Sequence, residues 1–106
     1  PIFLEPTLVE LLGATCLYAM AETVEEAVKR GIPKEAAVSF LTGHIYNLSA
    51  NFLGYIPGNP PVSDACKVAI GLGNRLVMRE DWKQIWKDDV LDKVIATMLH
   101  PENPQI

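Results

Sequence analysis

The chain has 106 residues, 49% of them hydrophobic, so it is the size of one domain and can bury a core. Nine basic residues stand against thirteen acidic ones, and no basic run could neutralise a phosphate backbone, so no nucleic acid partner is expected. The uncharged, apolar residues 11–21 are fewer than the roughly 20 that cross a bilayer, so no membrane partner is expected either.

A first helix is predicted from Pro6, where the missing proline N–H costs no hydrogen bond, to Gly31. Residues 8–21 are apolar on almost every side, which is typical of a helix covered by other helices, another domain or another subunit. The last part of this helix is charged, and Glu25 and Lys29 have the spacing of an i,i+4 ion pair.

A second helix is predicted from Pro33 to about Leu53, because apolar side chains there repeat at helical spacing. The short connection through residues 31–33 predicts that the two long helices form a tight antiparallel hairpin. Residues 54–61 hold three prolines and two glycines, so they are predicted to form a loop.

A short helix is predicted next, capped by Ser63 and running from Asp64 to about Leu72. Residues 71–74 are expected to end it. Their Gly-Leu-Gly run imitates a dinucleotide-binding turn, but Leu76 stands where the third glycine belongs and no strand precedes it. We therefore predict no cofactor-binding residue in this chain.

The remaining elements are also helical. Asp81 is expected to cap a turn over residues 82–86, and Asp88 or Asp89 to cap a last helix that stops at residues 100–101. The inward side chains of that helix are expected to be Val90, Leu91, Val94, Ile95 and Met98. No segment alternates with a period of two, so the predicted fold is all-α: one helical domain over residues 1–106, a long hairpin plus shorter C-terminal helices.

The sequence gives little support for a metal site or a disulfide bond. Cys16 and Cys66 are fifty residues apart, and neither is three or four residues from His44 or His100, so no metal site is predicted. Free thiols of this kind favour a reducing, cytoplasmic location.

The polar side chains of the second helix form the more interesting group. His44, Asn47 and Asn51 are spaced by three and four residues, which places them along one edge of the helix. A core histidine beside two solvent-facing asparagines is the alternative interpretation. Glu5 and Glu10, near the start of the first helix, are by themselves ordinary surface carboxylates favoured by the helix dipole.

The chain resembles the C-terminal domain of the 6-phosphogluconate dehydrogenase-like, or β-hydroxyacid dehydrogenase-like, NAD(P)-dependent oxidoreductases. The resemblance extends over nearly the whole chain. It rests on the runs Leu4-Glu5-Pro6-Thr7, Ala21-Glu22, Glu25-Glu26-Ala27, Gly31-Ile32-Pro33, Phe40-Leu41-Thr42-Gly43-His44-Ile45, Ser63-Asp64-Ala65 and Asp81-Trp82-Lys83.

This resemblance implies a Rossmann domain upstream that binds NAD or NADP, with substrate held between the two domains. It also implies hydride transfer between the nicotinamide and a hydroxy acid, and a helical domain that helps to form a homodimer. The fragment alone is then expected to be inactive.

The chain departs from the family at the start of the first helix, where the wider group carries a catalytic lysine. Its first lysine is Lys29, so we expect His44 and Glu5 to be catalytic instead, with Asn47, Asn51 and Glu10 binding substrate. The phosphosugar enzymes also use a cationic cluster for the phosphate, whereas this chain ends in a short acidic tail, which favours an unphosphorylated sugar acid or 3-hydroxy acid as substrate. Binding of a phosphate or carboxylate by Arg75, Arg79 and Lys67 is the alternative. The alternative function is a free-standing helical interaction or regulatory module without catalysis.

Overall fold

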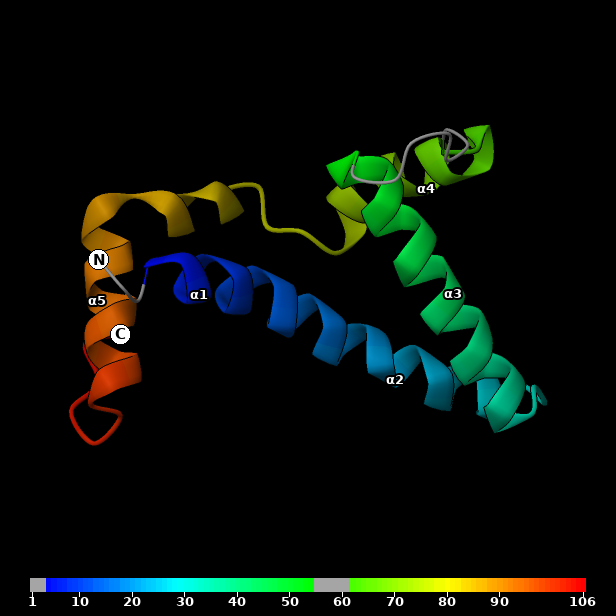
Figure 1. Ribbon diagram of the computed structural model, residues 1–106, viewed down its shortest axis with the longest axis horizontal. Helices are drawn as coiled ribbons and strands as arrows, with labels where there is room; N and C mark the ends of the chain where they lie inside the picture. The colour runs from blue at the N-terminus through cyan, green and yellow to red at the C-terminus, as the bar shows by residue number, and fades with distance from the viewer. Residues whose placement is uncertain (1–3, 55–61) are drawn as a thin grey trace. The chain divides into compact units, whose positions relative to one another are not determined.

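The computed structural model describes residues 4–54 and 62–106, and all regular structure in those residues is helical (Figure 1). The predicted all-α class is confirmed. The helices are α1 (Leu4–Leu8), the π-helix η1 (Val9–Ala14), α2 (Thr15–Lys29), α3 (Lys34–Leu53), α4 (Asp64–Leu76), the 3-10 helix η2 (Trp82–Trp86) and α5 (Asp88–Leu99).

The chain divides into two compact units. Unit one comprises residues 1–19 and 78–106, and unit two comprises residues 20–77. The expectation of one domain over residues 1–106 stays a prediction. Of the predicted loop, Gly54 lies outside the helices with a φ of 65°, and residues 55–61 lie outside the described residues.

The first helical run begins at Leu4, two residues before the predicted start. Pro6 still lies in the first turn, where backbone N–H groups have no intrahelical partner, so the helix accommodates it. The π-helical segment Val9–Ala14 was not predicted. The predicted end is confirmed, because Gly31 has a φ of +93°, which side chains other than glycine rarely adopt.

The run Leu4–Lys29 has 26 residues and, by length and composition alone, is long and apolar enough to cross a membrane. The expectation that the first helix is too short to cross a bilayer rested on residues 11–21 alone and is wrong by length and composition. A central helix of a soluble protein has the same length and composition, so this observation is weak evidence for a membrane. The expected absence of a membrane partner stays a prediction.

In unit one, α1 packs against α5, and η2 also packs against α5 (Figure 1). Leu91 of α5 is buried, and Thr7 of α1 is fully buried with its hydroxyl 3.7 Å from the sulfur of Met98. The predicted inward face of α5 is confirmed in part. Leu91 is buried and Val90, Val94 and Ile95 are half-buried, but Met98 is 44% exposed.

Two predicted caps in unit one are wrong in detail. Asp88 and Asp89 lie inside the first turn of α5, where acidic side chains favour the helix dipole, and Lys87 occupies the N-cap position. Asp81 does occupy the N-cap position of η2, but its side chain makes no capping bond. Its carboxylate instead accepts hydrogen bonds from Arg79 at 3.1 Å and Gln84 at 3.3 Å.

In unit two, α2 and α3 meet at the Gly31 turn and then diverge (Figure 1). The predicted tight hairpin is therefore wrong. Pro33 has an extended backbone with a ψ of 138°, and together with Gly31 it sets the direction in which α3 leaves the turn. The helix bounds themselves agree with the sequence, since α3 follows Pro33 and ends at Leu53.

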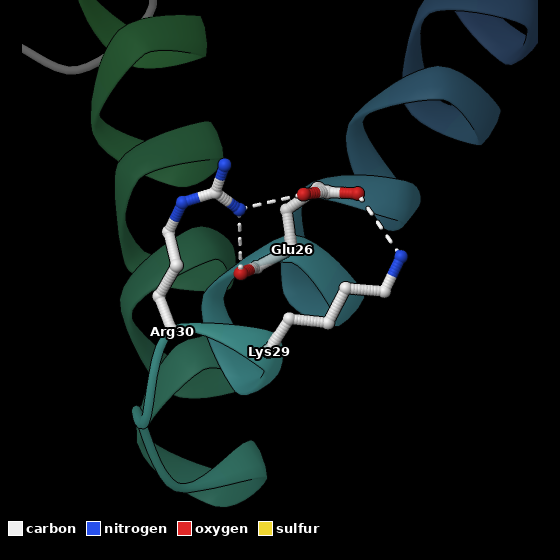
Figure 2. Close-up of polar contacts among 3 residues, drawn as sticks. All are labelled: Glu26, Lys29 and Arg30. Carbon is white, nitrogen blue, oxygen red and sulfur yellow. Dashed lines mark hydrogen bonds and ion pairs between the residues drawn. The ribbon is translucent and has the colours of Figure 1, made fainter.

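The predicted ion pair between Glu25 and Lys29 does not form. Lys29 binds Glu26 at 3.3 Å, and Arg30 binds the other carboxylate oxygen of Glu26 at 2.6 Å, as Figure 2 shows. All three side chains are more than half exposed, so these pairs contribute little to stability.

Helix α4 begins as predicted, with the Ser63 hydroxyl accepting a hydrogen bond from the Cys66 N–H at 3.1 Å. Its predicted end at residues 71–74 is wrong, because the helix continues through both glycines to Leu76. Neither Gly71 nor Gly73 has a positive φ, so neither ends the helix.

Replacing Gly71 by alanine is expected to raise the free energy of unfolding by roughly 0.5–1 kcal/mol, because alanine is the better helix former. An added Cβ at Gly71 meets nothing within 4 Å. Gly31→Ala is the matched control. It is expected to lower the free energy of unfolding by about 1–2 kcal/mol, because alanine is strained at the φ of +93° that Gly31 adopts. Urea unfolding of the full-length protein measures both. Equal effects of the two changes would contradict the helical assignment of Gly71.

Candidate functional site

His44 lies on α3 with an exposed side chain, so it is not a core residue of this chain. Its Nδ1 atom is 3.1 Å from the backbone oxygen of Phe40, one helical turn earlier. The two rings also contact each other, with centroids 4.2 Å apart and planes tilted by 36°. The imidazole is therefore held at two points by a single neighbour.

An apolar groove of about 520 Å³ lies in unit two beside the Gly31 turn, between the last part of α2 and the first half of α3. Phe40 and His44 belong to its wall, and Phe40 is 69% exposed. The other lining residues are Thr23, Val24, Ala27, Ile32, Ala36, Ala37 and Leu41. Among these lining residues, His44 carries the one ionisable side chain. The groove was not predicted from the sequence, because a tight hairpin of the two helices would leave no space for it.

The two predicted asparagines share the edge of α3 with His44. Asn47 is exposed and Asn51 is half-buried. The Asn51 amide donates to the backbone oxygen of Asn47 at 2.9 Å, so one of its donors is used within the helix. The structure therefore places these three polar side chains along one edge of a single helix, as the spacing predicted.

The two predicted glutamates lie in the other unit. Glu5 is in the first turn of α1 and Glu10 is in the π-helical segment η1, and both are exposed. Glu5 and Glu10 thus belong to unit one, whereas His44 belongs to unit two. Their catalytic and binding roles stay predictions.

A second groove, of about 550 Å³, lies in unit one and is largely apolar. It contains none of the predicted site residues. Its lining residues are Leu4, Leu8, Val9, Trp86, Asp88 and Leu91.

The described residues do not fit a dinucleotide or a metal ion as a complete site. Gly71 and Gly73 lie within a helix rather than in a strand-to-helix turn, so their N–H groups are not arranged to hold a pyrophosphate. Residues 4–54 and 62–106 contain no group of three or more histidine, cysteine or acidic side chains placed to hold a metal ion. Cys16 and Cys66 are free and half-buried.

Residues 2–99 match the family model of the phosphogluconate dehydrogenase (decarboxylating) C-terminal domain. This match covers nearly the whole chain, and the helical fold agrees with it. The chain therefore belongs to this family.

Individual proteins similar to this chain share the name D-apionate oxidoisomerase. The D-apionate oxidoisomerase of Blautia hydrogenotrophica is 93% identical over 104 residues, which are 98% of this chain and 36% of that protein. The D-apionate oxidoisomerase of Cupriavidus necator is 42% identical over 92 residues, 86% of this chain and 33% of that protein. The chain thus spans about a third of the length of these relatives.

A solved structure agrees with this assignment. It is a semialdehyde dehydrogenase NAD-binding protein from Cupriavidus necator in complex with calcium and NAD. Its sequence is 41% identical, and the match covers 89% of this chain and 34% of that one with a TM-score of 0.75. The described fold therefore matches about a third of that protein.

Proposed function

We propose that this chain is the C-terminal domain of an NAD-dependent enzyme that oxidises and isomerises D-apionate. The observation that carries the proposal is the 93% identity to the Blautia hydrogenotrophica D-apionate oxidoisomerase across 98% of the chain. D-apionate carries no phosphate, which agrees with the expectation of an unphosphorylated sugar acid drawn from the missing cationic cluster.

The nicotinamide cofactor is assigned to the rest of the protein, because the described residues of this chain do not form a pyrophosphate site. NAD is favoured over NADP by the solved relative, which contains NAD. When bound, the nicotinamide supplies the hydride acceptor. We expect the isolated chain to be inactive, because its described residues do not form a pyrophosphate site.

This chain contributes the helical wall beside the substrate. In the proposal, His44 accepts the proton of the substrate hydroxyl, and Asn47 and Asn51 bind other hydroxyls through donor and acceptor contacts. Glu5 and Glu10 are the carboxylates proposed to assist from the first helical run. What supports His44 is its exposure, its place in the groove wall and its fixed ring.

The full-length protein is expected to reduce NAD with D-apionate as substrate. The value of kcat/KM for 6-phosphogluconate is expected to be at least about 10²-fold lower, since a site without a cationic cluster leaves the phosphate unpaired. NADH absorbance measures the oxidation, and NMR of the product detects the isomerisation. NADH formation with 6-phosphogluconate at an equal rate would refute the substrate assignment.

We also propose that the full-length protein is a homodimer. In unit one, large apolar side chains of the first helical run are exposed, among them Val9 at 63%, Leu17 at 47% and Tyr18 at 77%. Such a surface needs cover in solution, and a two-fold dimer is the commonest way to provide it.

Light scattering of the full-length protein is expected to give the mass of a dimer. Tyr18→Glu is expected to shift that mass toward the monomer, while Glu22→Gln, on the same helix, leaves it unchanged. A monomeric wild type at high concentration would contradict the proposal.

A free-standing interaction module is not supported by a specific observation, because the named relatives are enzymes of about three times this length. A cytoplasmic location rests on the two free thiols and stays a proposal.

A further inference from the structure

The contact between His44 and Phe40 determines where the imidazole carries its proton. The Nδ1 atom lies 3.1 Å from the Phe40 carbonyl oxygen, and a carbonyl oxygen can only accept a hydrogen bond. The Nδ1 atom must therefore be the donor. A neutral imidazole has one N–H, so its Nε2 atom carries the lone pair.

The ring is also fixed in direction. The Phe40 ring lies against the imidazole with its centroid 4.2 Å away, so the two contacts together oppose rotation of the His44 side chain. No hydrogen-bond partner of Nε2 is found within residues 4–54 and 62–106. Because the imidazole belongs to the groove wall, Nε2 remains available to a bound molecule.

We propose that Phe40 holds His44 as the Nδ1-protonated tautomer and that Nε2 is the atom that takes the substrate proton. The second half of this statement rests on the proposed function. In the step, the substrate O–H bond breaks and an N–H bond forms at Nε2. The electron pair of the O–H bond becomes the new C=O bond, and the nicotinamide held by the rest of the protein would accept the hydride that leaves the carbon. The imidazolium then returns its proton to water. Phe40 is a positioning residue.

Long-range proton–nitrogen NMR of the full-length protein with labelled histidine tests the tautomer directly. The signals of His44 are identified by their loss in His44→Asn. We expect the Nδ1-protonated form to exceed the other neutral tautomer by about fivefold or more, the preference that one hydrogen bond of ordinary strength produces. A dominant Nε2-protonated form would overturn the proposal.

Phe40→Leu removes the ring and keeps the backbone oxygen. It is expected to lower kcat several-fold with little change in KM, and to broaden the His44 nitrogen signals as the imidazole gains freedom. Tyr46→Leu is the matched control, an exposed aromatic residue on the same helix that makes no ring contact with His44. An identical response of kcat and nitrogen signals to both changes would remove Phe40 from the proposal.

The reacting atom is tested by two replacements of His44. Asparagine keeps a short amide on the side of Nδ1 but has nothing in the place of Nε2, whereas glutamine places an amide near Nε2 that does not transfer protons. Both are expected to lower kcat/KM by about 10²-fold or more. Near-normal activity of His44→Asn would overturn the role of Nε2.

These outcomes separate this inference from the proposed function. If the wild-type protein turns over D-apionate and His44→Asn does too, the inference fails and the function stands. If the wild type has no activity toward D-apionate, the proposed function fails, and the NMR result alone decides the tautomer.

Discussion

His44→Ala in the full-length enzyme is expected to lower kcat/KM by roughly 10²-fold or more while the melting temperature and the affinity for NAD hold. The loss is expected because His44 is the one ionisable side chain in the wall of the unit two groove and is the residue proposed to take the substrate proton. Stability holds because His44 is exposed, so its truncation creates no cavity. Turnover and melting are measured on the same purified variant.

Thr42→Ala is the matched control for this experiment. The Thr42 hydroxyl is exposed on the same helix and donates to the backbone oxygen of Val38 at 2.8 Å, the same kind of local bond that His44 makes with Phe40. Its loss is expected to leave kcat/KM within about twofold. A destabilised but fully active His44→Ala protein would refute the catalytic assignment. If Glu5→Gln lowers kcat/KM strongly and His44→Ala does not, the catalytic residue is Glu5 and not His44.

The largest expected effect on stability belongs to Leu91. This residue is 7% exposed on α5, which packs against α1 and η2 in unit one. Leu91→Ala is expected to cost about 2–4 kcal/mol, because the lost side chain removes buried apolar contacts and leaves a cavity. Urea unfolding of the full-length protein measures the cost, and amide exchange shows whether unit one opens.

Leu91→Met controls for the change of shape at this position. It nearly conserves volume, so a cost below about 1.5 kcal/mol is expected. A cost below about 1 kcal/mol for Leu91→Ala would mean that unit one does not depend on this contact.

The helices of unit two show which features could be predicted locally. The Ser63 cap and the Gly31 turn were both predicted, because each depends on residues within one helical turn. The glycines of α4 show the opposite case. Gly71 and Gly73 are typical of a helix end, yet the backbone hydrogen bonds continue past them, since Val77 donates to the Gly73 oxygen at 2.8 Å.

In the candidate site, too, some features could be predicted from the sequence and others could not. The common edge of His44, Asn47 and Asn51 follows from helical spacing and was predicted. The contact of His44 with Phe40 also has i,i−4 spacing, but the sequence does not show which ring nitrogen faces the carbonyl. The position of Glu5 and Glu10 relative to this edge depends on two separate units, so neither the spacing nor the described structure determines it.

The sequence by itself determined that the chain is helical, where most helices begin, and which enzyme family it resembles. These features depend on periodicity, caps and turns within a few residues of one another. Only the tertiary structure decided that α2 and α3 diverge and that a groove lies between them with His44 in its wall. The physical reason is that the direction of a helix depends on a few backbone angles at its turn and on packing between distant side chains. Neither leaves a local pattern in the sequence.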